Sequence, residues 1–244
     1  HRGHRRGAIN GQNGMTYGDS WNQTLEDMNT LCDYLKTTYN KGVVLIGHSY
    51  GSFLSQRFIE LHSDKLEGAI LSGTAHMKNA LLASGKLIAS IQAFFVGEDK
   101  PGKLINKLSF GNYNKPFADQ GQEFAWLSRD KEQVAKYEAD PDCGYVLCIG
   151  YYLSFFRGVM KMYGADAKTI SPDFKLMIAV GSDDPVSNRS VLATKLNNFY
   201  LGLGLKPEFK VYPGARHEIL NETNKDEVYL DFAKFVDSAF HVGE

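Results

Sequence analysis

The sequence predicts an α/β fold, in which a mostly parallel sheet is flanked by helices and carries a long helical insertion. Short unbroken apolar runs alternate with amphipathic stretches, as in a succession of βαβ units. Residues 75–172 interrupt this alternation between the second and the third apolar run. A Gly-x-Ser-x-Gly pentapeptide joins the first apolar run to the helical stretch after it.

The first part of the chain predicts two helices and two strands. Helices are expected over residues 20–38 and 50–62, and strands over residues 43–46 and 68–73. The run at 43–46 is apolar throughout, which is typical of a strand buried on both faces of a parallel sheet. The first helix has one apolar face. This face comprises Leu25, Met28, Leu31, Cys32 and Leu35.

The same pattern returns after the interruption. Strands are expected over residues 175–181 and 208–212, and helices over residues 189–201 and 226–240. The last helix has an inward apolar face. This face comprises Val228, Phe232, Phe235, Val236 and Ala239. Strands that alternate with helices imply a parallel sheet with right-handed crossovers.

The chain therefore divides into three parts. Residues 1–74 and 173–244 are expected to form the two parts of an α/β core, and residues 75–172 a helical cap. Aromatic and methionine residues recur at helical spacing within this insertion, at Tyr151, Tyr152, Phe155, Phe156, Met160 and Met162. They could line a pocket for an acyl chain, although such a stripe is also typical of an ordinary core. An insertion between two strand ends is well situated to cover a site there.

Composition and charge exclude several classes of protein. The 244 residues are 43% hydrophobic and 23% charged, which suits one large core rather than a disordered chain. The 27 basic and 28 acidic residues nearly cancel, so nothing favours nucleic acid as a partner. The cluster of Arg2, Arg5 and Arg6 is interpreted as a solvated end of the chain rather than a binding patch.

Cysteine usage and hydropathy bear on the compartment. The three cysteines include no CxxC pair, which indicates neither a disulfide framework nor a zinc site. No apolar run is long enough to span a bilayer, and no secretory signal is visible, although one could precede His1. We therefore expect a cytoplasmic protein with no stable membrane insertion.

The pentapeptide Gly47-His48-Ser49-Tyr50-Gly51 is the strongest local signal in the chain. Between a buried strand and a helix, it predicts a strained turn that presents Ser49 as a nucleophile at the carboxyl edge of the sheet. Gly47 and Gly51 remove side chains that would clash there. The backbone amide of Tyr50, at the start of the helix, can point at a developing oxyanion.

A nucleophilic serine needs a base, and the base needs an acid to orient it. Among the histidines after Ser49, His62 and His241 are interpreted as surface residues, and His76 is a weaker candidate. His217 follows a predicted strand, so a loop can carry it over the sheet edge. His217 is therefore the predicted base.

The acid is expected in the turn Gly181-Ser182-Asp183-Asp184-Pro185, directly after a predicted strand. We favour Asp184 over Asp183, because the following proline fixes the turn that presents it. Asp183 would then be a solvated or turn-capping neighbour. The interval between Asp184 and His217 has room for one helix and one strand, which the pattern supplies.

Two other motifs resemble known binding motifs but lack residues that those motifs require. His217-Glu218-Ile219-Leu220-Asn221 begins like a zinc-binding HExxH, but asparagine replaces the second histidine, so no metal site is predicted. The glycines near residues 202 and 204 lack the rest of a dinucleotide fingerprint. No cofactor is expected.

Several motifs together resemble the α/β-hydrolases, in particular the bacterial monoacylglycerol lipase and lysophospholipase-like enzymes grouped with S33-type serine aminopeptidases. The resemblance covers nearly the whole chain. Besides the pentapeptide, it depends on His1-Arg2-Gly3-His4, Trp126-Leu127-Ser128-Arg129-Asp130, Asp140-Pro141-Asp142-Cys143-Gly144, Gly181-Ser182-Asp183-Asp184-Pro185-Val186, and the stretch from Gly214 to Glu222.

This resemblance implies an α/β-hydrolase fold with a Ser49, Asp184 and His217 triad under a helical cap. It implies hydrolysis of a small acyl ester, such as a monoacylglycerol, a lysophospholipid or a simpler ester, through an acyl-serine intermediate. A peptide or amide hydrolase and a non-catalytic ligand-binding module are the alternatives. A homo-oligomer is compatible with the Met-rich, aromatic cap.

The chain departs from the family in two ways. Arg5 and Arg6 stand where related sequences continue with a glycine and, further on, a serine. No His-Gly pair supplies the second oxyanion donor in this chain, so either the chain is a fragment or the protein lacks that donor. We expect the opening strands of the sheet and this donor to lie before His1, because a sheet without those strands would expose an edge and apolar faces.

Overall fold

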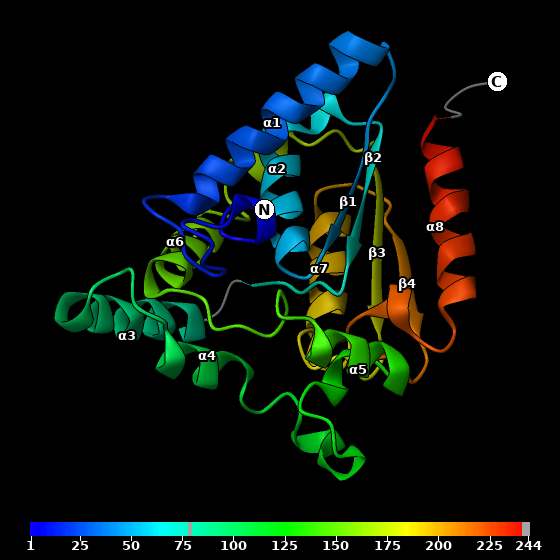
Figure 1. Cartoon of the computed structure of the whole chain (residues 1–244). Coiled ribbons are helices and arrows are strands. Elements are labelled where there is room, and N and C mark those ends of the chain that lie inside the picture. Colours follow the sequence, from blue (N-terminus) through cyan, green and yellow to red (C-terminus); the bar gives the residue numbers. More distant parts are fainter. Residues whose placement is uncertain (78–79, 241–244) are drawn as a thin grey trace. The chain divides into compact units, whose positions relative to one another are not determined.

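The computed structural model describes residues 1–77 and 80–240. Over these residues, it is an α/β fold with a four-stranded parallel sheet in the order β1-β2-β3-β4 (Figure 1). The strands are β1 (Val44–His48), β2 (Gly68–Ser72), β3 (Lys175–Gly181) and β4 (Glu208–Tyr212). The observed strands follow the predicted ones closely, and the predicted fold class is confirmed.

The chain forms two compact units, which are described separately. The sheet unit comprises residues 28–76, 126–133 and 162–240, and the helical unit comprises residues 1–27, 77–125 (apart from 78–79) and 134–161. Two helices, α1 (Ser20–Tyr39) and α5 (Lys131–Ala139), have residues in both units.

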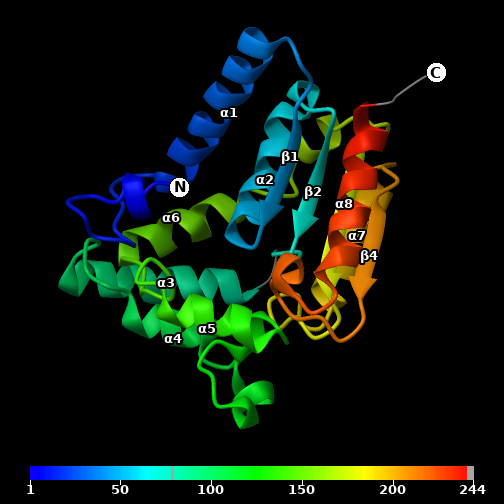
Figure 2. The same cartoon turned by 45° about the vertical axis from the view of Figure 1, so that its right-hand side comes forward.

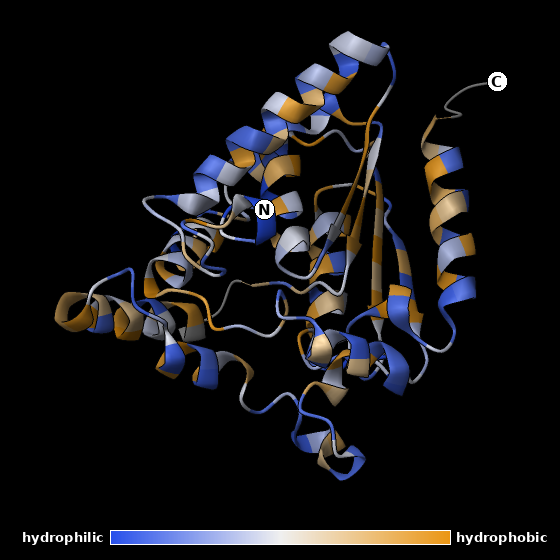
Figure 3. Cartoon of the chain, in the orientation of Figure 1, coloured by the Kyte–Doolittle hydropathy of each residue, from blue (hydrophilic) through white to orange (hydrophobic). Residues whose placement is uncertain are grey.

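Helices cover both faces of the sheet in the sheet unit. Figures 1 and 2 show α2 (Tyr50–His62) and α7 (Val191–Gly202) on one face and α8 (Lys225–Phe240) on the other. Side chains of α8, β2, β3 and β4 form a core on the α8 face. Its buried members are Ile70, Met177, Ala179, Tyr212, Ala215, Ile219, Val228, Phe232 and Phe235. Apolar colours accordingly predominate on β3 and recur on α8, whereas β4 is mixed (Figure 3).

The first strand differs from its prediction. We expected residues 43–46 to be buried on both faces, but Ile46 is 50% exposed and Val44 is half-buried. In the described residues, β1 pairs only with β2 and forms one edge of the sheet. Ile46 is the register partner of Ile70, whose side chain belongs to the α8 core, and this core does not extend over Ile46.

Short 3₁₀ helices connect the elements of the sheet unit. They are η2 (Ser63–Lys65), η4 (Ala125–Leu127, whose first residue belongs to the helical unit), η5 (Asp166–Thr169) and η6 (Ile219–Asn221). In this unit, each of the four strands ends at the same edge of the sheet because all of them are parallel. Loops that follow the strands can therefore bring distant residues together there.

The helical unit is built around the packing of α3 (Ala80–Val96) on α6 (Ile149–Val159). Besides the parts of α1 and α5 that belong to this unit, it contains α4 (Lys103–Phe110), η1 (Arg5–Gly7) and η3 (Lys115–Gln120). Trp21, which the periodicity did not single out, is 1% exposed, and its backbone amide donates to Ser154 Oγ at 2.8 Å. Tyr152 and Phe156 of the aromatic stripe are buried, whereas Tyr151 and Phe155 are half-buried.

The apolar face expected for α1 is only partly buried. Leu25 and Cys32 are buried, but Leu31 is 55% exposed.

Among the described residues, no helix combines the length and the apolar character needed to cross a membrane.

Candidate active site

Ser49 lies in the sharp turn between β1 and α2. Its backbone is in a rarely populated region, with φ +53° and ψ −120°. A Cβ atom at Gly47 would collide with Ser55 Oγ and the Gly51 carbonyl, so the turn requires glycine at that position. The strained turn holds the serine at the carboxyl end of β1.

The structure brings the three predicted triad residues together. His217 Nε2 is 2.8 Å from Ser49 Oγ, and His217 Nδ1 is 3.0 Å from Asp184 Oδ1. Asp184 and His217 are both buried, and the Val186 amide also donates to Asp184 Oδ1 at 2.8 Å. The backbone amide of Asp183 donates to the Ala215 carbonyl at 2.9 Å, and the hydrogen bond to His217 comes from Asp184.

The three residues follow the carboxyl ends of three of the four strands of the sheet unit. Ser49 follows β1, Asp184 follows β3, and His217 follows β4. The arrangement can remove the hydroxyl proton from Ser49 while the Asp184 carboxylate orients the imidazole and stabilises its charged form.

The amide of Tyr50 is the first of α2, directly after Ser49. The amides at a helix N-terminus point along the axis and favour negative charge. The Ser49 carbonyl accepts from the amides of Ser52 and Phe53, at 2.8 Å and 3.3 Å, which fixes the first turn of the helix.

Sequence reasoning missed three neighbours of His217. The ring of His48 lies 4.8 Å from the ring of His217, and the ring of Trp126 lies 5.2 Å from it, between centroids. Gly73, which follows β2, has φ +55°, and a Cβ there would lie 2.9 Å from His48 Cε1 and 3.0 Å from His217 Cε1. His48 was visible within the pentapeptide, but its contact with a residue far along the chain was not.

His48 is held neutral. Its Nδ1 is 3.1 Å from the hydroxyl of Ser72, its register partner on β2. Burial of the imidazole, and next to it the positive charge that His217 can carry, lowers the pKa of His48 to about 3.

A series of hydrogen-bonded, buried polar side chains leads to the turn at Ser49. Ser52 Oγ donates to the Ser49 carbonyl at 2.6 Å and lies 2.9 Å from Thr74 Oγ1. Gln56 Nε2 donates to the same Thr74 oxygen at 2.8 Å, and the Tyr163 hydroxyl donates to Gln56 Oε1 at 2.7 Å. The series therefore connects the carbonyl of Ser49 to the segment after α6.

The other histidines are not part of this arrangement. His76, the weaker candidate, is buried and stacks on Tyr163 with the ring centroids 4.2 Å apart. His62 is the half-buried last residue of α2, and His241 lies outside the described residues. Within the described part of the chain, no group of three or more His, Cys, Asp or Glu residues is arranged to hold a metal ion.

With this geometry in view, comparisons with known proteins identify the family. The chain matches the family described as serine aminopeptidase, S33, over residues 1–224. It belongs to this family. The S33-type family is one of hydrolases, so the family and the arrangement around Ser49 are consistent with each other. No curated protein matches the chain significantly.

Solved structures with the same fold include esterases and lipases. A thermostable carboxyl esterase from Bacillus coagulans has 23% identity and a TM-score of 0.87, over 98% of this chain and 79% of that one. A soluble variant of monoglyceride lipase from Saccharomyces cerevisiae has 19% identity and a TM-score of 0.67, over 95% and 73%. The monoacylglycerol lipase of Paleococcus ferrophilus has 16% identity and a TM-score of 0.64, over 94% and 78%. These likenesses establish the α/β-hydrolase fold of this S33-type chain.

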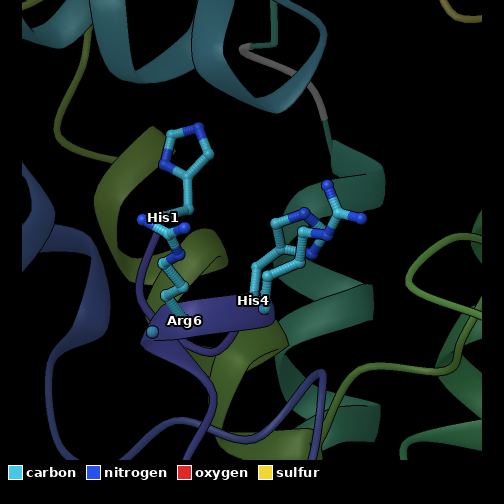
Figure 4. Close-up of a pocket in the computed structure, with 5 residues that line it drawn as sticks. His1, His4 and Arg6 are labelled. Atoms are coloured by element: carbon cyan, nitrogen blue, oxygen red, sulfur yellow. The ribbon is translucent and has the colours of Figure 1, made fainter.

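The basic cluster at the start of the chain is partly paired within the helical unit. Arg2 forms an ion pair with Asp27, and Arg5 forms one with Asp142. A hollow beside them is lined by His1, His4, Arg5, Arg6 and Gly7 (Figure 4). None of the three predicted triad residues lines this hollow.

Proposed function

We propose that this S33-type hydrolase cleaves carboxylic esters through an acyl-serine intermediate. The observation that carries the proposal is the continuous pair of contacts from Ser49 Oγ to His217 Nε2, 2.8 Å, and from His217 Nδ1 to Asp184 Oδ1, 3.0 Å. A serine hydroxyl, a base and a buried carboxylate in this order are the groups that acyl transfer requires.

In the first half of the reaction, Ser49 Oγ attacks the ester carbonyl while His217 Nε2 takes the hydroxyl proton. Asp184 stabilises the imidazolium. The imidazolium then protonates the leaving alkoxide, which departs as an alcohol and leaves the acyl group on Ser49. Water deacylates the serine in the second half, with His217 again as base, and releases the carboxylic acid.

The oxyanion of each tetrahedral intermediate needs donors that are fixed in advance. We propose the backbone amide of Tyr50 as one donor, because it follows the nucleophile at the N-terminus of α2. The second donor is proposed to come from a His-Gly loop that the 244 residues do not contain.

For the substrate, we propose a monoacylglycerol, a lysophospholipid or a simpler acyl ester. The formal net charge of −1 gives no preference for strongly anionic substrates. Proteins of the same fold are named carboxyl esterase and monoacylglycerol lipase. The helices of the insertion, residues 75–172, are proposed to act as a cap over the acyl group.

A fluorophosphonate probe tests the chemistry directly. It should label the wild-type protein at Ser49 and should not label Ser49→Ala. Folded wild-type protein that resists the probe, or an esterase activity that survives in Ser49→Ala, would contradict the proposal.

A second candidate, cleavage of an aminoacyl amide, is favoured by the family description, serine aminopeptidase. Rates of hydrolysis for a short-chain ester, a monoacylglycerol and an aminoacyl amide separate the two. We expect both esters to be cleaved faster than the amide. The reverse order would make the amide hydrolase the better assignment.

A further inference from the structure

His217 lies on a loop without regular structure, between the end of β4 at Tyr212 and the start of η6 at Ile219. A base on such a loop can act only if the backbone around it is fixed, because a displacement of about 1 Å can cost roughly 100-fold in rate. The residues on either side of His217 therefore decide whether its ring stays within reach of Ser49.

Glu222 holds one side of this loop. Its side chain is fully buried, and Oε1 accepts from the backbone amides of Arg216 and Arg129 at 2.9 Å and 3.0 Å. Oε2 accepts from Arg129 Nε at 2.8 Å and from the Thr223 amide at 3.0 Å. A buried carboxylate is costly unless it is paired and hydrogen-bonded, and here four N–H groups converge on it.

The other side of the loop is held by the segment Trp126–Arg129. The amide of Glu218 donates to the Leu127 carbonyl at 2.7 Å. Arg216 Nη1 donates to the Ser128 carbonyl at 3.0 Å. Both neighbours of His217 in the sequence are thus tied to this segment, and the ring of Trp126 lies beside the imidazole.

Arg129 joins the two supports. Its guanidinium pairs with Glu222, and its Nη2 donates to Asn224 Oδ1 at 2.8 Å. Ser128 Oγ also donates to the carbonyl of Asn221 at 2.8 Å. One carboxylate therefore connects the Trp126–Arg129 segment, the residue before His217 and the residues after η6, all within the sheet unit.

We propose that Glu222 is a positioning residue for His217, acting through the backbone of Arg216 and through the Trp126–Arg129 segment. The proposal rests on the proposed function, in which His217 is the base. It assigns a role to the Trp-Leu-Ser-Arg motif, which the triad leaves unused. Replacing the carboxylate by an amide would turn one acceptor oxygen into a donor facing other N–H groups.

The test compares Glu222→Gln with Glu218→Gln in the full chain. Glu218 provides a matched control, because it loses the same charge one residue after His217, and its carboxylate is half-buried and accepts from Asn221 Nδ2. Steady-state kinetics on a p-nitrophenyl ester give kcat and KM. Proton NMR follows the downfield resonance of the proton shared by His217 and Asp184, which is identified by its absence from His217→Gln.

We expect Glu222→Gln to lower kcat about 10- to 100-fold, with KM changed less than about twofold, and to weaken or shift the downfield resonance. Glu218→Gln should leave both unchanged. A folded Glu222→Gln protein with wild-type kcat and resonance would overturn the proposal, as would an equal loss in Glu218→Gln.

Two further outcomes are also decisive. If Glu222→Gln does not fold, Arg129→Met replaces it in the test. This variant removes the counter-ion of Glu222 and keeps the backbone amides that donate to it. A loss of kcat of about 3- to 10-fold supports the proposal, and an unchanged kcat overturns it. If the wild type shows no esterase activity, the proposed function fails, and the resonance in Glu222→Gln alone decides the positioning role.

Discussion

The imidazole rings of His48 and His217 lie 4.8 Å apart, with their planes inclined at 47°. The pKa of His48 is lowered to about 3, first by desolvation of its imidazole and next by the positive charge that His217 can carry, so His48 is neutral at neutral pH. The proposed base, His217, thus has a neutral histidine as its neighbour. When His217 is protonated during the reaction, no second positive charge on His48 repels it.

Acid stability should depend on His48. The ordinary pKa of histidine is about 6.5, so below that pH the unfolded chain takes up a proton at His48 that the folded protein does not. The folded state therefore loses stability as the pH falls, by about 2 kcal/mol between pH 7.5 and pH 5 from this residue. His48→Gln should be less sensitive to acid by about that amount, as measured by urea unfolding at the two pH values.

His62→Gln is the control for this comparison. Burial lowers the pKa of His62 as well, but this residue is at the half-buried end of α2. Its replacement should change the acid sensitivity less than that of His48. Equal pH dependence in wild type and His48→Gln would show that His48 takes up its proton in the folded protein.

Gly73→Ala should disturb the proposed site without a change in its functional groups. The new methyl group would press on His48 Cε1 and His217 Cε1, and alanine is also strained at φ +55°. We expect kcat/KM for an ester to fall about 100-fold, since His217 would be pushed from Ser49. Gly202→Ala, whose added Cβ meets nothing within 4 Å, should keep the wild-type value. Comparable losses in both would mean that the approach of the two rings to Gly73 is unimportant.

The two adjacent aspartates should differ strongly in their effect. Asp184→Asn removes the carboxylate that accepts from His217 and should lower kcat about 10,000-fold by favouring the wrong tautomer. Asp183→Asn, in which the backbone contact with Ala215 is retained, should change kcat by less than about threefold. Ester hydrolysis by the two purified variants measures this, and a larger loss in Asp183→Asn would reverse the assignment.

Packing of the helical unit can be tested at Gly158, in α6. A Cβ there would collide with the indole of Trp21, so Gly158→Ala should lower the free energy of unfolding by about 1–3 kcal/mol. Gly150, in the same helix, is a matched control, because its added Cβ would lie 3.3 Å from Glu98 Cβ and no closer to other atoms. Gly150→Ala should therefore cost less stability than Gly158→Ala, whose Cβ would lie 2.3 Å from the indole, and thermal unfolding compares the two. A Gly158→Ala protein as stable as Gly150→Ala would mean that Trp21 packs differently.

The sequence predicted best those features that depend on local periodicity and on the order of elements along the chain. Every predicted strand has its counterpart in β1 to β4, and α2 begins directly after Ser49 as expected. Parallel strands meet at one edge, so residues placed just after strand ends could be expected to converge, as Ser49, Asp184 and His217 do.

What could not be predicted depends on contacts between distant parts of the chain. Ile46 is exposed because the core on the α8 face does not extend over it, which an apolar run does not reveal. The contacts of Trp126 and Glu222 around His217 join segments about ninety residues apart, as in the Arg129–Glu222 pair with a separation of 93. No local pattern predicts such pairs. The Trp-Leu-Ser-Arg motif could be recognised in the sequence, but its contacts with the loop of His217 could not.

The backbone of Ser49 also limits which residues could replace it as the proposed nucleophile. At φ +53° a side chain branched at Cβ meets the backbone, so threonine would be excluded although it carries the same hydroxyl. Cysteine is unbranched and fits the same dihedral angles. The backbone geometry, rather than the reactivity of the side chain, therefore allows cysteine in place of Ser49 and excludes threonine.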